Sequence, residues 1–549
     1  MSERARRALA ACIGALASGA ALAVCAQLPR FGPALALVAL APWLVALDAQ
    51  RSLRGALLAA AAFCFAYVAL VLGWFAAAIS AFTGASATCG WLALAALAPA
   101  LEPQVFTFAA ARFALRARGV SAAAIALGSA CVWVATEWAL PKLLGDSLGL
   151  ALHPAPALRQ GADLAGVSGL TLIVLLVNDC ARECSLRARG VTAGSDPAVA
   201  PPGRRLRAAA PLALGGALVA ALASYGALRG RALDAEIARA PRIRAALVQA
   251  NIARYGALAR ELGTGGAVAQ ILEAHFALSF EALAREPLDL VVWPETVYPT
   301  TFGAPKSEDG AAFDRAIAAY AARAGAPLVF GAHEADAAGE YNAAIFLEAD
   351  GAGRVSWDAY RKAAPFPLTE RVPAWLDSPW LRERAPWLGS WRAGAGAKTV
   401  SIALPRGGAL RAAPLICYDA LDASLARAAV SEGAQLLLVL SNDSWFAQAG
   451  GPRLHLLVAA FRSIETGRAQ LRAANTGISA AISPRGEIVA SLGVGERGAL
   501  VAEAPLIVSR PPHVRLGDWL GPLACAVAIA HLALAGSRRR GAPRAITSR

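Results

Sequence analysis

The sequence predicts a multi-span α-helical membrane domain combined with an α/β soluble domain. A chain of 549 residues is too long for one ordinary domain. A mean hydropathy of +0.49 with 16% charged residues is unlike that of a soluble protein. Apolar stretches gather before residue 229 and after residue 512. Between them, short apolar runs alternate with amphipathic segments, which is the pattern of a layered α/β domain.

Seven apolar stretches precede residue 229 and an eighth follows the polar block. Most of them approach the roughly 20 residues that a helix needs to cross a bilayer. We therefore expect a transmembrane domain of seven helices over residues 1–228, a soluble domain over 229–512, an eighth transmembrane helix over 513–536 and a basic cytoplasmic tail over 537–549. The stretches lie at residues 8–28, 33–47, 57–82, 85–110, 122–140, 165–177, 208–228 and 518–535.

The basic residues predict the orientation of the chain. The formal net charge is +14, but the arginines form short runs beside apolar stretches instead of one basic face, so we expect no nucleic-acid partner. Cytoplasmic loops are rich in Arg and Lys. Counting alternate loops places both ends of the chain in the cytoplasm and residues 229–512 on the periplasmic side of a bacterial inner membrane. The cytoplasmic side carries Arg4, Arg6, Arg7, Arg51, Arg54, Arg112, Arg116, Arg118, Arg182, Arg187, Arg189, Arg204, Arg205, Arg207 and five arginines of the tail, against Arg30, Lys142 and Arg159 on the other side.

The polar block has the strand and helix pattern of an α/β domain. Its β-branched or leucine-rich runs read as strands, and its amphipathic segments read as helices. We expect strands at residues 243–249, 288–293, 327–331, 343–347, 400–404, 413–416, 435–440, 471–474 and 480–483, and helices at 267–285, 310–324, 421–431 and 452–467.

Cys417 is the only cysteine in this block, at the end of one predicted strand and directly before a helix-like segment. Peptide dipoles and free N–H groups at a helix start favour a thiolate, so Cys417 is a candidate nucleophile. A small buried hydrophobe is the commoner fate of a free cysteine.

Two further groups stand where they could serve such a nucleophile. Glu295 follows a buried-looking strand, and Lys362 is one of only four lysines in the chain. Ligands of α/β domains gather at the carboxyl ends of strands, so the three side chains could converge. Glu295 would accept the thiol proton, while Lys362 and a backbone N–H after the cysteine would stabilise an oxyanion. The alternatives are an exposed glutamate and a solvated lysine.

Other features of the chain leave the chemistry to ordinary side chains. The six histidines lack metal-ligand spacing and there is no phosphate-binding glycine loop, so we expect no metal and no cofactor.

Glu102 and Glu137 fall within apolar stretches, where carboxylates are costly and often functional. A proline-broken segment with five tryptophans, from Trp357 to Trp391, is expected to form a lid or an interface anchor instead of core.

Several motifs resemble a known superfamily. Trp293-Pro294-Glu295, Tyr360-Arg361-Lys362 and Cys417-Tyr418-Asp419 resemble the Glu-Lys-Cys motifs of the nitrilase (carbon-nitrogen hydrolase) superfamily. With the membrane stretches on both sides, the whole chain resembles the apolipoprotein N-acyltransferase family. Further matches are Gln249-Ala250-Asn251, Glu370-Arg371-Val372-Pro373, the run from Ser441 to Phe446, Gly451-Pro452, His455 and the run from Arg472 to Gly477.

The resemblance implies a fold, a reaction and a site. The soluble domain would be a nitrilase-like αββα sandwich. An acyl chain would pass from a phospholipid to Cys417 as a thioester, and then to the α-amine of the diacylglyceryl cysteine that begins an apolipoprotein. Glu295 would be the general base and Lys362 the oxyanion stabiliser. The auxiliary or substrate-binding residues would be Glu370, Tyr418, Asp419, Trp293 and Trp445.

The chain departs from the family pattern at two positions near the site. The family usually has Glu at the place of Asp419, and Val-Pro-Phe-Gly-Glu at the place of residues 366–370. Asp is one methylene shorter than Glu, and Thr369 does not share the freedom of glycine at positive φ. We therefore expect a different set of contacts at Asp419 and a different loop path before Glu370.

Two alternative functions remain open from the residues. In a membrane-tethered amidase of the same superfamily, water would resolve the thioester. In a transporter, the soluble block would only bind ligand, and Glu102 and Glu137 would line the pathway.

Overall fold

The computed structural model of the protein describes residues 2–28, 31–140, 142–192, 202–253, 255–350, 352–446 and 450–540. The chain divides into two compact units, one formed by Met1–Gly230 with Asp518–Arg549 and the other by Arg231–Gly517. These bounds lie within a few residues of the sequence-based division. Arg30 and residues 541–549 of the expected basic tail lie outside the described residues.

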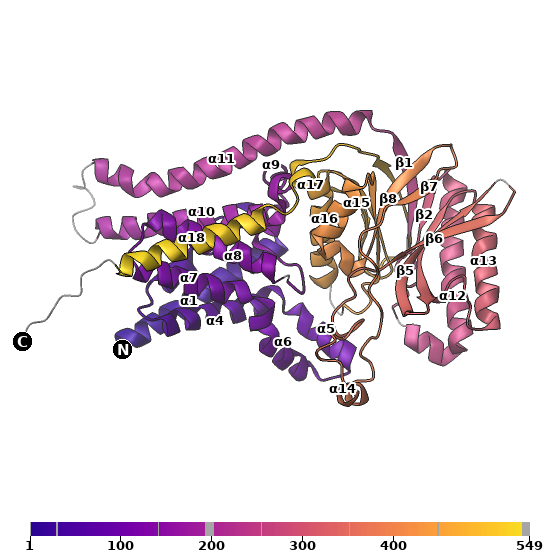
Figure 1. The fold of residues 1–549 in the computed structure, drawn as a ribbon, viewed down its shortest axis with the longest axis horizontal. Helices are drawn as coiled ribbons and strands as arrows, with labels where there is room; N and C mark the ends of the chain where they lie inside the picture. Colours follow the sequence, from indigo (N-terminus) through magenta and orange to yellow (C-terminus); the bar gives the residue numbers. More distant parts are fainter. Residues whose placement is uncertain are drawn as a thin grey trace, which may run out of the picture. The chain divides into compact units, whose positions relative to one another are not determined.

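The first unit is helical (Figure 1). Its elements are α1 (Glu3–Gln27), α2 (Gly32–Ala36), α3 (Ala41–Asp48), α4 (Leu53–Val71), α5 (Trp74–Thr83), α6 (Ala87–Leu101), α7 (Pro103–Ala117), α8 (Ala122–Ala139), η1 (Leu148–Leu152), α9 (Pro156–Arg159), α10 (Ala162–Thr192), α11 (Pro202–Arg239, which continues into the second unit) and α18 (Leu520–Arg540).

By length and composition, six helices among the described residues could cross a membrane, or seven if the bent pair α5 and α6 is one span. One of the six is α12 (Tyr255–Arg285), which belongs to the second unit and packs Val268, Ile271 and Leu272 into its core. Such burial explains its apolar composition without a bilayer.

Three of the expected membrane stretches are each divided into two helices, and the stretch 33–47 becomes α2 and α3. The stretch 57–82 becomes α4 and α5, and the stretch 85–110 becomes α6 and α7, with Glu102 between them at φ −125° and ψ 51°. A residue before proline is disfavoured in the α region, and Pro103 follows Glu102. The apolar composition of this stretch masked that signal.

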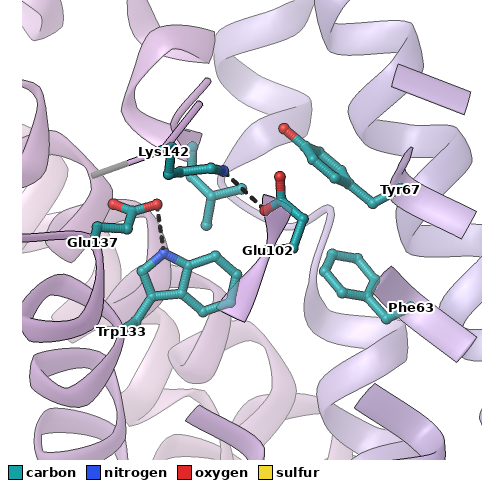
Figure 2. A pocket seen from close by; sticks show the side chains of 7 residues that line it. Phe63, Tyr67, Glu102, Trp133, Glu137 and Lys142 are labelled. Atoms are coloured by element: carbon teal, nitrogen blue, oxygen red, sulfur yellow. Dashed lines mark hydrogen bonds and ion pairs between the residues drawn. The ribbon is translucent and has the colours of Figure 1, made fainter. Parts of the chain in front are cut away.

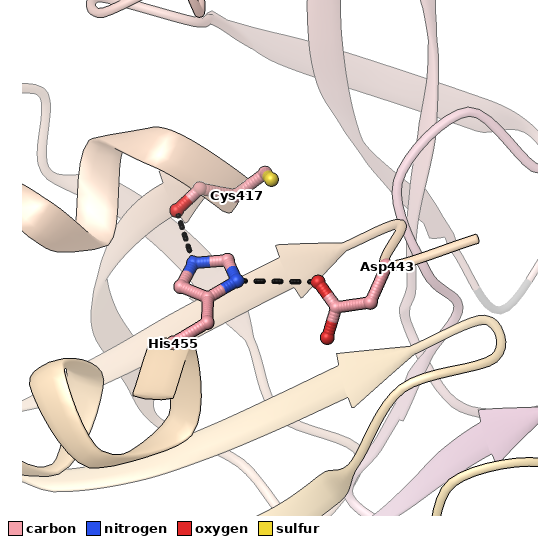
Figure 3. A group of neighbouring side chains, drawn as sticks. All are labelled: Cys417, Asp443 and His455. Carbon is pink, nitrogen blue, oxygen red and sulfur yellow. Dashed lines mark hydrogen bonds and ion pairs between the residues drawn. The ribbon is translucent and has the colours of Figure 1, made fainter. Parts of the chain in front are cut away.

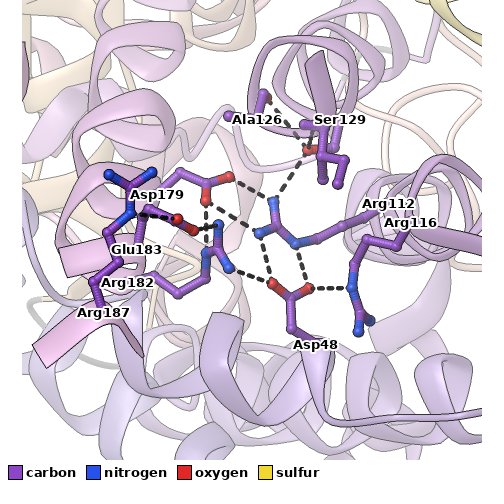
Figure 4. Close-up of polar contacts among 10 residues, drawn as sticks. Asp48, Arg112, Arg116, Ala126, Ser129, Asp179, Arg182, Glu183 and Arg187 are labelled. Atoms are coloured by element: carbon purple, nitrogen blue, oxygen red, sulfur yellow. Dashed lines mark hydrogen bonds and ion pairs between the residues drawn. The ribbon is translucent and has the colours of Figure 1, made fainter. Parts of the chain in front are cut away.

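A buried ion-pair network joins α3, α7 and α10 of the helical unit (Figure 4). Arg112 Nε lies 2.8 Å from Asp48 Oδ1, and Arg112 Nη1 lies 2.5 Å from Asp179 Oδ2. Arg182 contacts the same two carboxylates, each at 2.7 Å. Arg112 and Arg182, which the sequence suggested only as orientation signals, therefore also hold three helices together.

Replacing Arg112 by methionine is expected to destabilise the protein by roughly 3–5 kcal/mol, because Asp48 and Asp179 would lose a buried partner. Thermal unfolding in detergent would measure the change. The control is Arg7→Met, which breaks an exposed pair with Glu3 and should cost at most about 1 kcal/mol. Equal effects of the two substitutions would show that the buried network adds no stability.

The second unit contains two sheets. Within the described residues, one sheet has the order β13-β1-β2-β4-β5-β6 with β3 paired to β4, and the other has the order β12-β11-β10-β9-β8-β7. The strands are β1 (Arg242–Gln249), β2 (Leu290–Val292), β3 (Tyr298–Thr301), β4 (Leu328–Asp336), β5 (Gly339–Ala349), β6 (Val355–Arg361), β7 (Val400–Ala403), β8 (Ala409–Ile416), β9 (Leu436–Ser441), β10 (Ala469–Ala474), β11 (Ser479–Ile482), β12 (Ile488–Leu492) and β13 (Gly498–Pro505).

Successive residues of a strand point to opposite faces of its sheet, and this separates the core between the sheets from the core under the helices. In β1, Leu247 packs between the two sheets, whereas Ala246 and Val248 pack toward the helices. Figure 1 shows α12 and α13 (Glu308–Ala324) on one side of the sheets, and α15 (Ala423–Ser431) and α16 (Gly450–Thr466) on the other. The shorter helices are η2 (Cys417–Leu421), α14 (Pro379–Arg384) and α17 (Pro512–Leu516). The expected αββα sandwich is confirmed.

Candidate active site

Three segments of the second unit bring Glu295, Lys362 and Cys417 together. Glu295 lies in the loop after β2, Lys362 follows β6 directly, and Cys417 is the first residue of η2 after β8. All three are buried. Lys362 Nζ lies 3.0 Å from Glu295 Oε1. The charges of Glu295 and Lys362 both act on the Cys417 thiol.

Backbone and amide donors fix the Glu295 carboxylate. Asn342 Nδ2 donates to Oε1 at 2.8 Å, and the backbone N–H of Asn442 donates to Oε2 at 2.9 Å. Asn342 was not expected from the sequence, although a polar residue inside the otherwise apolar run of β5 is an available signal. A cavity of about 180 Å³ adjoins Glu295, and Ile271 and His275 of α12 line it, whereas Lys362 and Cys417 do not.

Lys362 is held between two carboxylates. Its Nζ lies 2.7 Å from Glu370 Oε1, in addition to the contact with Glu295. Burial alone would lower the pKa of Lys362, but the attraction of Glu295 and Glu370 outweighs burial and holds the pKa well above its usual value. Lys362 is therefore a fixed positive charge at neutral pH.

The loop before Glu370 shows how the departure at Thr369 is accommodated. The residue at positive φ is Leu368, at 67°, and not Thr369. Glu370 still closes the loop, because its Oε2 accepts a hydrogen bond of 2.5 Å from the Phe366 N–H. The carboxylate reaches Lys362 although glycine is missing.

Cys417 has a left-handed backbone, with φ 47°, at the start of η2. Burial raises the pKa of its thiol well above the usual range, the charge of Glu295 raises it further, and Lys362 opposes them. Burial therefore works against the thiolate that a helix start favours, and it stabilises the neutral thiol. A neutral thiol needs a base, and among the carboxylates around Cys417 it is Glu295 whose charge acts on the thiol most strongly.

Asp419 is buried, and its carboxylate joins the segment of Cys417 to the segment of Lys362. Its Oδ1 accepts from the Ala364 N–H at 2.7 Å, and its Oδ2 accepts from the Ile416 N–H at 3.0 Å and the Tyr360 hydroxyl at 2.9 Å. Burial raises the pKa of Asp419 to about 7. The shorter side chain thus ties the residue before Cys417 to the strand that precedes Lys362.

Aromatic rings lie beside the nucleophile. The Phe366 ring contacts the rings of Tyr418 and Trp445, with centroid distances of 4.9 Å and 5.1 Å. These contacts place Trp445 in one aromatic cluster with Tyr418, the residue after Cys417.

Trp293 does not face the site. It is fully buried in the core between the first sheet and its helices, and its Nε1 donates to Ser279 Oγ at 2.9 Å. Neighbouring residues of a strand point to opposite faces, so Val292 packs between the sheets and Trp293 points away from them. Trp293 was expected to be an auxiliary or substrate-binding residue, and its place in the core argues against a direct contact with substrate.

Glu102 and Glu137 line a small polar pocket in the helical unit (Figure 2). Lys142 Nζ lies 2.8 Å from Glu102 Oε2 and 2.7 Å from Asp146 Oδ2. Trp133 Nε1 donates to Glu137 Oε1 at 3.0 Å. These partners place the two carboxylates in a buried polar network of the helical unit.

The tryptophan-rich segment is only partly buried. The side chains of Trp375, Trp380 and Trp387 are 85%, 61% and 46% exposed. Trp391 instead packs on the His333 ring, with centroids 4.4 Å apart. Core packing therefore does not explain Trp375, Trp380 and Trp387, and their role as a lid or an interface anchor stays a prediction.

Comparison with known proteins agrees with this architecture. Residues 244–510 match the carbon-nitrogen hydrolase family, and residues 18–180 match the apolipoprotein N-acyltransferase N-terminal domain. An apolipoprotein N-acyltransferase of Caulobacter vibrioides is 30% identical, over 92% of this chain and 91% of that protein. One of Bradyrhizobium diazoefficiens is 30% identical, over 74% and 72%. Saccharomyces cerevisiae Nit3, of the nitrilase superfamily, is 20% identical with a TM-score of 0.35, over 51% of this chain and 95% of that one.

Proposed function

The chain belongs to the apolipoprotein N-acyltransferase family, and we propose that it moves a fatty acyl chain from a phospholipid, through a thioester on Cys417, to the α-amine of the diacylglyceryl cysteine that begins an apolipoprotein. The observation that carries this proposal is the buried group of Glu295, Lys362 and Cys417, with Lys362 Nζ 3.0 Å from Glu295. Thioester chemistry on a neutral thiol needs a proton acceptor and a positive charge for the oxyanion, and this group supplies both. The homologues favour neither the amidase nor the transporter alternative.

In the first step the Cys417 sulfur attacks the carbonyl carbon of a phospholipid ester. Glu295 accepts the thiol proton as the C–S bond forms. Lys362 and the backbone N–H of Tyr418 stabilise the oxyanion. When the intermediate collapses, the C–O bond to glycerol breaks and Glu295 returns the proton to the departing oxygen. The products are the thioester and a lysophospholipid.

In the second step the acceptor amine attacks the thioester carbon. Glu295 accepts a proton from the amine, the C–S bond breaks, and the proton returns to the Cys417 sulfur. The amide leaves and the resting thiol is restored, so no oxidant, reductant or cofactor enters the balance.

We place this reaction at the periplasmic surface of a bacterial inner membrane, following the distribution of arginine. A multi-pass protein suits a lipid donor, because lifting an acyl chain out of a bilayer costs about 0.8 kcal/mol for each exposed CH₂ group. A catalytic domain that the chain joins to membrane helices at both its ends would avoid most of that cost.

The test is a transfer assay with purified protein in detergent. The donor is a phospholipid with a labelled acyl chain, and the acceptor is a synthetic peptide that begins with diacylglyceryl cysteine. The wild-type protein should move the label to the peptide amine, and Cys417→Ala should not. The matched control is Cys12→Ala, which removes an exposed cysteine of the helical unit and should leave transfer unchanged.

Two results would contradict the proposal. Transfer that survives in Cys417→Ala would remove the thioester from the mechanism. Release of the label as free fatty acid, with none on the peptide, would assign the thioester to hydrolysis.

A further inference from the structure

Cys417, His455 and Asp443 form a buried cluster in the second unit (Figure 3). One thiol, imidazole and carboxylate atom of each lie within 4.8 Å of one another. By residue type the cluster could be a thiol–imidazole pair in which His455 is the base, or a metal site. The hydrogen bonds distinguish these possibilities.

His455 contacts the backbone of Cys417 and not its sulfur. Nε2 lies 3.0 Å from the Cys417 carbonyl oxygen, and Figure 3 shows the sulfur on the other side of that residue. A carbonyl oxygen only accepts, so Nε2 carries the hydrogen. This nitrogen has no free lone pair, and it can neither take the thiol proton nor bind a metal ion.

The other side of the ring is held by a charged pair. Nδ1 lies 3.1 Å from Asp443 Oδ1, and Arg472 Nη2 lies 3.0 Å from Asp443 Oδ2 and 3.2 Å from the same ring nitrogen. Ser441 Oγ donates to Asp443 at 2.8 Å. The Arg472 guanidinium therefore already neutralises the Asp443 carboxylate, which a metal ion would need as a ligand. The ring is fixed at both nitrogens.

Fixing the Cys417 carbonyl also fixes the N–H of Tyr418, because both belong to one planar peptide unit. In a trans peptide the N–H points opposite to the carbonyl. η2 starts at Cys417, so the N–H groups of its first residues have no partner within the helix. With its carbonyl bound to His455, the peptide presents the Tyr418 N–H on the side away from the ring.

We propose that His455 is a positioning residue, which clamps the Cys417 carbonyl so that the Tyr418 N–H is aimed at the oxyanion. Asp443 and Arg472 hold the imidazole for this purpose. This inference rests on the proposed function, in which Cys417 forms a thioester through an oxyanion. Without the clamp, the left-handed peptide at Cys417 is free to rotate its N–H away from the acyl oxygen.

Two isosteric substitutions separate the two hydrogen bonds of the ring. In His455→Gln the amide nitrogen can occupy the place of Nε2 and donate to the Cys417 carbonyl. In His455→Asn it can occupy only the place of Nδ1, which faces Asp443. The readouts are the single-turnover rate of acyl-enzyme formation from phospholipid, and the rate of iodoacetamide alkylation at Cys417 followed by peptide mass spectrometry.

The glutamine variant should acylate within about threefold of the wild-type rate, whereas the asparagine variant should be about 10²-fold slower, the usual loss for one oxyanion donor. Alkylation forms no oxyanion, so its rate should change less than about threefold in both variants. If asparagine restored acylation and glutamine did not, the ring would act only through Asp443. If alkylation fell in parallel with acylation, His455 would act on the thiol. Either result overturns the inference.

Acylation of the wild-type protein and of His455→Asn separates this inference from the proposed function. A wild-type protein that gives no acyl group on Cys417 would overturn both. A wild-type protein that is acylated, with His455→Asn acylated as fast, would overturn the role of His455 alone.

Discussion

Replacing Glu295 by glutamine is expected to slow acylation of Cys417 by roughly 10²- to 10⁴-fold, the loss typical of a general acid–base residue. The amide keeps the shape and can still occupy the place beside Lys362, but it cannot carry the thiol proton to the departing glycerol oxygen. Single-turnover acylation by phospholipid measures the change.

The same substitution should have the opposite effect on simple alkylation. The Glu295 charge raises the pKa of the Cys417 thiol, while Lys362 lowers it. Without the carboxylate charge the thiol pKa falls, the thiolate fraction at a given pH rises, and iodoacetamide should react faster. The control is Glu334→Gln, which removes a carboxylate paired with Arg361 and should change neither rate. A fall in both rates in Glu295→Gln would indicate lost structure instead of a lost base.

Replacing Lys362 by methionine is expected to reduce acylation by roughly 10²- to 10³-fold through loss of the fixed charge at the oxyanion. It should also destabilise the fold by roughly 3–5 kcal/mol, since the buried carboxylates of Glu295 and Glu370 would lose their common cation. Acylation rates and thermal unfolding measure the two effects.

The matched control for Lys362 is Lys398→Met. Lys398 pairs with Asp358 in a half-exposed setting, so its loss should cost at most about 1 kcal/mol. Unfolding near the wild-type temperature in Lys362→Met would show that the buried pairs do not support the fold. Full acylation in that variant would remove Lys362 from the chemistry.

Much of the architecture could be predicted from the sequence because it depends on local patterns. β-branched or leucine-rich runs such as residues 243–249 indicated strands that the structure contains, and the change in composition near residue 229 lies beside the division between the two compact units. Glu295 and Cys417 were recognisable because each stands just after an apolar run, where a fold of this class presents its loops, and Lys362 because it is one of only four lysines in the chain.

Other features depend on contacts that no local pattern encodes. The direction of the Trp293 side chain depends on the strand register, which points it into the core between the first sheet and its helices. The pairing of Arg112 with Asp48 and Asp179 joins residues far apart in the chain. The bond from His455 to the Cys417 carbonyl depends on how α16 packs beside η2. The sequence showed these residues but gave no reason to connect them.

The central claim is that Cys417 carries the acyl chain, and the intact mass of the protein after incubation with phospholipid alone tests it most directly. The wild-type protein should gain the mass of one acyl chain, which neutral hydroxylamine removes as it does a thioester, and Cys417→Ala should gain nothing. The same adduct on Cys417→Ala, or a wild-type protein of unchanged mass, would contradict the account.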